Sequence, residues 1–138
     1  MAKKSDKKVI MLSIHPKYVN AIMDGSKKVE FRRNGVPEDI SNIVVYATSP
    51  MKQIIGYCEI SECVVSTPDK LWEKYNAVGG IKRRDFSLYY KGYETGKCYI
   101  IKKAVRFNKS VSFNDFSSIK TPPQSFIYVN NVEFEQLL

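Results

Sequence analysis

The sequence predicts a small α+β domain, a mixed β-barrel of about five or six strands with two or three short helices at its openings. Runs of strand length recur along the chain, some continuously apolar and some with every second residue apolar. Short amphipathic segments separate some of these runs. The regular succession of strand and helix that marks a doubly wound sheet is not seen. The 138 residues, 43% of them hydrophobic, suffice for one core. We therefore expect a basic flexible tail at residues 1–8 and a single domain at residues 9–138.

The N-terminal elements are predicted from apolar runs and from helix stop signals. Residues 9–14 form an apolar run typical of a buried strand, which His15 and Pro16 end. Pro16 suits the first position of a helix, and Gly25 supplies its stop. The alternation at residues 28–33 is typical of a half-exposed strand, whose charged face should meet solvent or ligand.

The middle of the chain is expected to hold the longest strand. Residues 43–47 are continuously apolar and indicate a strand in the centre of a sheet. Residues 53–65 are rich in β-branched and aromatic side chains, with Gly56 as a candidate bulge. Thr67 and Pro68 then provide a helix N-cap and first residue.

The last part of the chain is less regular. We expect a second helix after the breaking pair Gly79 and Gly80, and then a strand, two ordered loops, a closing strand and a brief terminal helix. In order, these predicted elements occupy residues 82–90, 97–107, 112–117, 121–124, 125–129 and 132–138.

The charge balance points to a polyanionic partner. The formal net charge is +8, and a positive surface attracts phosphate backbones. Residues 2–8 carry four lysines and one aspartate, so without them the net charge falls to +5. The remaining domain is still basic, which favours RNA or single-stranded nucleic acid over the alternative of an ordinary soluble basic surface.

The cysteines and the N-terminus indicate a cytoplasmic protein. Cys58, Cys63 and Cys98 form neither an even set nor a metal-ligand spacing, so we expect reduced core thiols. The start lacks the apolar region of a signal peptide, and no run of apolar residues is long enough to span a membrane. We therefore expect no membrane partner.

The most informative segment is residues 25–33. It places Lys27, Lys28, Arg32 and Arg33 around the single acid Glu30. Arginine can bind a phosphate or a guanine edge in a bidentate manner, lysine acts as a point charge, and a carboxylate can accept from a base amino group. The alternative is a solvated strand face with a cross-face ion pair.

Other chemistries have little support in the sequence. His15 is the only histidine, no ligand or nucleophile stands near it at a motif spacing, and a loop histidine at a helix start is the simpler interpretation. The glycines form no phosphate-binding loop. We expect no metal and no cofactor.

Aromatic side chains offer candidates for base stacking. Most of those between the two middle helices should be core, with one or two left for stacking, and Tyr46 and Phe126 are alternatives beside polar loop residues. The cluster between the helices comprises Trp72, Tyr75, Phe86, Tyr89, Tyr90 and Tyr93.

Several segments together resemble the ASCH-domain proteins of the PUA-like superfamily, in the branch described as predicted transcriptional regulators or RNA-binding proteins. The resemblance runs over about residues 9–128. It is carried by residues 12–16, 25–33, 46–50, 71–72, 80–81 and 122–126.

The resemblance implies a PUA-like β-barrel with a cleft beside the helix-to-strand motif. The family motif GxKxxxxR is matched by Gly25, Lys27 and Arg32, which should line that cleft. Further residues expected at or around it, besides the charged segment, are Ser13, His15, Tyr46, Thr48, Ser49, Gln124, Ser125 and Phe126.

Some ASCH relatives are amidohydrolases that deacylate a modified cytidine with the motif lysine, a threonine three residues later and a downstream glutamate. Lys27 matches the lysine, but Glu30 replaces the threonine and the glutamate position falls near Gly79. If the chain is an enzyme, Lys27 and Glu30 are the candidate catalytic residues.

The leading hypothesis is a binding module for RNA, single-stranded nucleic acid or a modified nucleotide, with a regulatory role. In it the cations engage phosphate, Glu30 or Gln124 reads a base edge, and an aromatic ring stacks on the base. The alternatives are a hydrolase acting on a modified nucleoside or on RNA, and a regulator that binds a protein partner.

Overall fold

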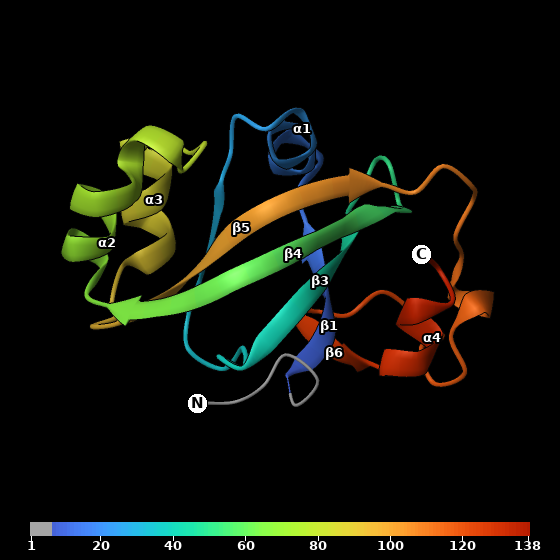
Figure 1. The fold of residues 1–138 in the computed structure, drawn as a ribbon. Coiled ribbons are helices and arrows are strands. Elements are labelled where there is room, and N and C mark those ends of the chain that lie inside the picture. The colour runs from blue at the N-terminus through green and yellow to red at the C-terminus, as the bar shows by residue number, and fades with distance from the viewer. Residues whose placement is uncertain (1–6) are drawn as a thin grey trace.

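The computed structural model describes residues 7–138, and most of the expected basic tail lies outside them. In the described part, one mixed six-stranded sheet carries four short α-helices (Figure 1). The elements in chain order are β1 (Lys8–Ile14), α1 (Pro16–Asp24), β2 (Val29–Arg32), β3 (Ile40–Ala47), β4 (Gln53–Ser66), α2 (Pro68–Tyr75), η2 (Asn76–Val78), α3 (Arg83–Tyr90), β5 (Gly96–Arg106), η3 (Phe113–Asp115), β6 (Phe126–Val129) and α4 (Asn131–Glu135). The predicted α+β class is confirmed.

The strand order is β2-β5-β4-β3-β1-β6. Strands β1 and β3 pair in parallel, and the other neighbouring pairs are antiparallel. The long β4 and β5 pair runs the length of the molecule in Figure 1. The described strands leave β2 and β6 as the two edges, so the predicted barrel is an open sheet rather than a closed ring.

The sheet is buried on both faces along β1 and β3. Ile10 and Leu12 point into a core cluster with α1, whereas Val9 and Met11 point into a second cluster that includes Phe134 of α4. Side chains alternate between the faces of a strand, so a strand covered on both sides reads as a continuous apolar run. This double burial explains why the apolar runs predicted these two strands.

A third core cluster joins β2 to the helices α2 and α3. Val29 and Phe31 pack there against Leu71, Phe86 and Tyr90. The apolar face of the alternating strand therefore packs onto the two helices, and its charged face is left to the opposite side. Of the predicted aromatic cluster, only Tyr93 is largely exposed, at 42%.

The predicted helix boundaries follow from capping. His15 is the N-cap of α1 with Pro16 at the first helical position, and Gly25 ends the helix in the left-handed conformation with φ of 85°. The Thr67 side chain caps α2 by accepting from the Lys70 amide. The largest boundary differences are at two elements: β3 begins at Ile40, ahead of the apolar run, and the last helix ends at Glu135.

The three cysteines are free thiols. Burial raises the pKa of Cys58 to about 12, and that of Cys98 to about 12. The thiols therefore stay protonated at neutral pH and pack as small apolar groups, as predicted. None of the helices in residues 7–138 has the length and apolarity that crossing a membrane requires.

Candidate functional site

The charged side chains of β2, and Lys27 shortly before it, turn inward. Lys27 is 3% exposed and Glu30 is 7% exposed, while Arg32 is half-buried. A solvated strand face, the alternative considered from the sequence, does not fit these exposures. Ionised groups are buried in proteins only where partners compensate the lost hydration, so the contacts of these three side chains define the site.

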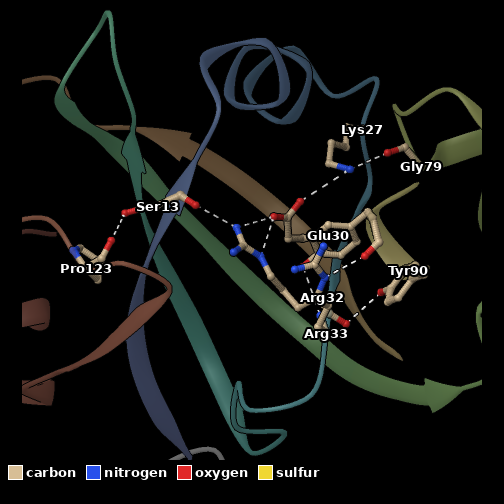
Figure 2. A network of polar contacts seen from close by, with 9 residues as sticks. Ser13, Lys27, Glu30, Arg32, Arg33, Gly79, Tyr90 and Pro123 are labelled. Carbon is tan, nitrogen blue, oxygen red and sulfur yellow. Dashed lines mark hydrogen bonds and ion pairs between the residues drawn. The ribbon is translucent and has the colours of Figure 1, made fainter. Parts of the chain in front are cut away.

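Glu30 lies between the two cations of the motif (Figure 2). Its Oε2 accepts from Arg32 Nε at 3.1 Å and from Arg32 Nη2 at 2.9 Å. Its Oε1 lies 3.6 Å from Lys27 Nζ. The carboxylate is thus engaged by both neighbours, and it holds Arg32 in one orientation.

Arg32 is fixed by two further elements. Its Nη2 also donates to the Ser13 carbonyl oxygen at the end of β1, at 3.0 Å. Its own carbonyl oxygen accepts from the Tyr90 hydroxyl of α3 at 2.8 Å. The Ser13 hydroxyl donates to the Pro123 carbonyl oxygen at 2.6 Å, so Ser13 links the site to the segment before β6 (Figure 2).

Lys27 is covered by the turn that follows η2. Its Nζ donates to the Gly79 carbonyl oxygen at 2.5 Å. Gly80 has φ of +62°, and a Cβ atom there would lie 2.8 Å from the Lys27 Cβ. Glycine is required at position 80 both for the backbone conformation and for this close approach. The pair of glycines that the sequence marked as a helix break therefore also covers the motif lysine.

These groups line a pocket of about 190 Å³. That volume is below the range of roughly 300–1,000 Å³ typical of drug-sized ligands, so the pocket suits one small planar group or an anion. Lining residues from the sequence prediction are Ser13, His15, Lys27, Glu30 and Arg32, and the remaining ones are Ile14, Tyr18, Phe31, Ile81 and Tyr89.

Two tyrosines give the pocket aromatic walls with hydrogen-bond donors. Burial raises the pKa of Tyr18, and the charges of Asp85 and Glu30 raise it further. Burial also raises the pKa of Tyr89. Both phenols therefore stay protonated at neutral pH. The Lys27 Nζ lies 5.3 Å from the Tyr18 ring centroid, where a cation interacts favourably with the ring.

The formal charges of Lys27, Glu30 and Arg32 sum to one positive charge. A positive group held rigidly in a partly buried site attracts an anion more strongly than the same group in water. The arrangement can therefore bind an anionic or electron-rich group, with the aromatic walls beside it.

Two predicted cations lie outside the pocket. Lys28 is exposed beside it in the chain. Arg33 is half-buried, with its guanidinium 4.3 Å from the Tyr89 ring centroid and 4.9 Å from that of Tyr93. Its Nε donates to the Tyr89 carbonyl oxygen at 2.8 Å, so Arg33 anchors β2 to α3.

The two predicted loops lie around the end of β1 rather than in the pocket lining. Thr48 is half-buried and donates its amide to the Ile14 carbonyl oxygen at 3.0 Å, and Ser49 is exposed. Gln124 and Ser125 are exposed, and the Ser125 carbonyl oxygen accepts from the Ser13 amide at 3.4 Å.

The two alternative stacking candidates are held by packing. Tyr46 is 5% exposed, and its ring centroid lies 5.6 Å from that of Phe113 in the second core cluster. Its ring is therefore not offered to a ligand. Phe126 is half-buried against the α1 side of the sheet.

His15 caps the N-terminus of α1 beside the pocket. It is exposed, and its Nδ1 accepts from the Lys17 amide at 3.1 Å. A neutral imidazole that accepts at Nδ1 carries its proton on Nε2. The Nδ1 lone pair is therefore used to cap α1.

The sequence missed Tyr18 and Ile81 as pocket residues and assigned Tyr89 mainly to the core. Tyr18 lies in the first turn of α1, close after the end of β1. The short link between β1 and α1 was the sequence feature that could have placed Tyr18 near the site. Within residues 7–138, no three His, Cys, Asp or Glu side chains are placed so that they could hold a metal ion.

Comparison with known proteins supports the resemblance seen in the sequence. The family model described as the ASCH domain matches residues 12–111. A Zymomonas mobilis protein named ASCH domain-containing ribonuclease is 26% identical over 137 residues, which cover 96% of this chain and 92% of the relative.

Solved structures match over nearly the whole chain. The crystal structure of ASCH from Zymomonas mobilis superposes with a TM-score of 0.84 at 26% identity and covers 96% of this chain and 94% of that chain. The N-terminal domain of Staphylothermus marinus McrB matches with a TM-score of 0.55 at 9% identity, covering 95% of this chain and 93% of that domain, and so shares the fold alone.

Replacing Glu30 with glutamine tests the structural part of this description. Glu30→Gln leaves two cations in a partly buried site without their counter-charge, so we expect the free energy of unfolding to fall by about 3 kcal/mol. Urea denaturation measures the loss. The matched control is Glu62→Gln on the exposed side of β4, which should change stability by less than about 0.5 kcal/mol. Equal, small losses in both variants would contradict a structural role for the ion network.

Proposed function

This chain belongs to the ASCH-domain family, and on that premise we propose that it binds RNA, with one base or phosphate of the ligand held in the pocket beside Lys27, Glu30 and Arg32. The proposal concerns recognition rather than a reaction. Arg32 supplies a cation with a fixed orientation, and Tyr18 supplies an aromatic face on which a base can stack.

The ion network is the observation that carries this proposal. Glu30 engages both Lys27 and Arg32 yet leaves one net positive charge at the pocket wall. A rigid cation beside tyrosine rings is the combination that RNA-binding sites use for phosphate and unstacked bases.

Two other facts support RNA as the ligand. The chain carries a net charge of +8, which favours polyanions. The Zymomonas mobilis relative, which matches over nearly all of both chains, is named a ribonuclease. We infer that Lys28 and Arg33 contribute to phosphate attraction at the mouth of the pocket, and that the protein acts as an RNA-binding regulator in the cytoplasm.

The site argues against deacylation of a free nucleoside. The resemblance placed the glutamate of the amidohydrolases near Gly79, and it is the Gly79 carbonyl oxygen that contacts Lys27. A main-chain carbonyl cannot transfer a proton. Glu30, at the threonine position, is engaged by two cations and lacks the hydroxyl that the relatives use.

Substitution of Tyr18 tests the pocket wall: it removes the ring contact with Lys27 Nζ but none of the ion pairs among Lys27, Glu30 and Arg32. Tyr18→Leu keeps most of the apolar volume but removes the ring. Stacking of one base contributes about 1–3 kcal/mol of binding free energy, so we expect RNA affinity to fall roughly 5- to 150-fold. Fluorescence anisotropy with a labelled single strand of about twelve nucleotides measures it.

The matched control is Tyr128→Leu, an exposed tyrosine of β6 on a different part of the surface. Its affinity should equal that of the wild type. Unchanged binding by Tyr18→Leu would remove the pocket from the binding surface, and no RNA binding by the wild type would refute the proposed function.

RNA cleavage is a second candidate, favoured by the name of the Zymomonas mobilis relative. Lys27 and Arg32 could stabilise the extra charge of a phosphorus transition state. A general base would have to come from His15, whose Nδ1 accepts from the Lys17 amide, or from Glu30, which is engaged by two cations.

His15→Asn separates a capping role from a catalytic one. Asparagine is a good N-cap, so the variant should keep the fold, and we expect both RNA binding and any RNA cleavage to stay within about twofold of the wild type. Gel analysis of labelled RNA, with and without a metal chelator, measures cleavage. Cleavage by the wild type that disappears in His15→Asn with binding intact would make His15 catalytic and would favour the enzyme over the binding module.

A further inference from the structure

A second groove lies away from the pocket, where β4 begins and β5 ends. It has a volume of about 260 Å³, and its lining includes Gln53, Arg106, Lys109 and Ser110. The Phe107 amide donates to the Ile55 carbonyl oxygen at 3.1 Å, which joins the segment after β5 to β4. The groove is therefore built on the rigid β4 and β5 pair rather than on a loop alone.

This groove is positively charged. Lys52, Arg106 and Lys109 are all exposed. Residues 46–58 and 104–114, which form the groove and its surroundings in the chain, contain no aspartate or glutamate. Farther back along β5, Lys102 has an acidic partner, since its Nζ lies 3.6 Å from Glu59 Oε1. The groove thus presents three exposed cations on chain segments that contain no acidic residue.

The groove is connected to the pocket through the turn between β3 and β4. Ile14, a pocket residue, accepts from the Thr48 amide at 3.0 Å, and Thr48 in turn accepts from the Lys52 amide at 3.3 Å. The residue after Lys52 lines the groove. In Figure 1 this turn lies to the right of α1, above the end of β5. Two backbone hydrogen bonds thus join a pocket residue to the turn that precedes the groove.

We propose that this groove is a second phosphate-binding site and that the ligand is a single RNA strand of several nucleotides, which runs from the pocket over residues 48–53 to Lys52, Arg106 and Lys109. This extension presupposes the RNA-binding function proposed above. A single strand suits both parts, because an unstacked base can enter the pocket while the backbone follows a groove of cations. Neutral polar groups such as Gln53 and Ser110 add donors that do not repel phosphate.

Ligand length is the property that tests the second site. The groove variant carries Lys52→Ala, Arg106→Ala and Lys109→Ala. The charge-matched control carries Lys70→Ala, Lys74→Ala and Lys91→Ala, which are exposed lysines on and after α2 and α3 at the opposite end of the β4 and β5 pair in Figure 1. Each protein is titrated with a labelled dinucleotide and with an unstructured strand of about twelve nucleotides, at several salt concentrations, after thermal melts confirm the fold.

We expect the groove variant to bind the longer strand about tenfold or more weakly at low salt. The slope of log affinity against log salt should shrink by about two, since each phosphate contact to a single strand contributes about 0.7. Dinucleotide binding should not change, and the control variant should retain the longer strand within about threefold.

The outcomes separate this inference from the proposed function. If the groove and control variants bind the longer strand equally, the second site is refuted while RNA binding in the pocket stands. If the wild type binds neither RNA, the proposed function fails and the second site fails with it. Equal loss of dinucleotide and longer strand in the groove variant would also refute a separate site.

Discussion

Glu30 is held between Lys27 and Arg32, and the organisation of the site depends on that arrangement. Burying a carboxylate is costly unless cations and hydrogen bonds replace its hydration, so the burial of Glu30 requires both partners. Those partners in turn require others: Arg32 needs the end of β1, and Lys27 needs the turn at residues 79–80. One buried acid thus ties α1, β1, β2 and the segment before α3 together, and the pocket forms where these elements meet.

The same arrangement is the basis of the proposal that the site recognises a ligand. A general base or a nucleophile needs a free lone pair, whereas Lys27 donates to the Gly79 carbonyl oxygen and Glu30 is engaged by two cations. Arg32 is oriented by the network and adds the positive charge that Glu30 does not cancel. Preorganised charge of this kind selects an anionic ligand. The aromatic walls of the pocket suit an RNA base, and the basic groove at the start of β4 and the end of β5 suits the phosphates.

The sequence predicted those parts of the fold that local physics determines. Proline and glycine signals located α1, and the doubly buried β1 and β3 appeared as continuous apolar runs. The order of the strands could not be read in this way, because pairing between β2 and β5 joins residues about seventy positions apart in the chain. Boundaries also shifted where polar residues are buried, as at Ser41 and Asn42 in β3.

For the site, the sequence located the charged segment but not its surroundings. The alternating pattern placed Lys28, Glu30 and Arg32 on one face of the strand. It could not show whether that face is solvated or buried, because burial depends on contacts with Ser13 and Gly79 from distant segments. Tyr46 illustrates the reverse case: beside a polar loop it is a plausible stacking residue, but η3 covers its ring. Residues that meet only in the folded chain leave no local pattern.

The most direct test of the central claim is where RNA contacts the protein. In a titration of the ¹⁵N-labelled protein with an unstructured RNA strand, we predict that the largest amide chemical-shift changes fall at residues 13–18, 30–33 and 79–89, around the pocket. Changes confined to β6 and α4, or an absence of changes at saturating RNA, would contradict the assignment of this pocket as the RNA-binding site.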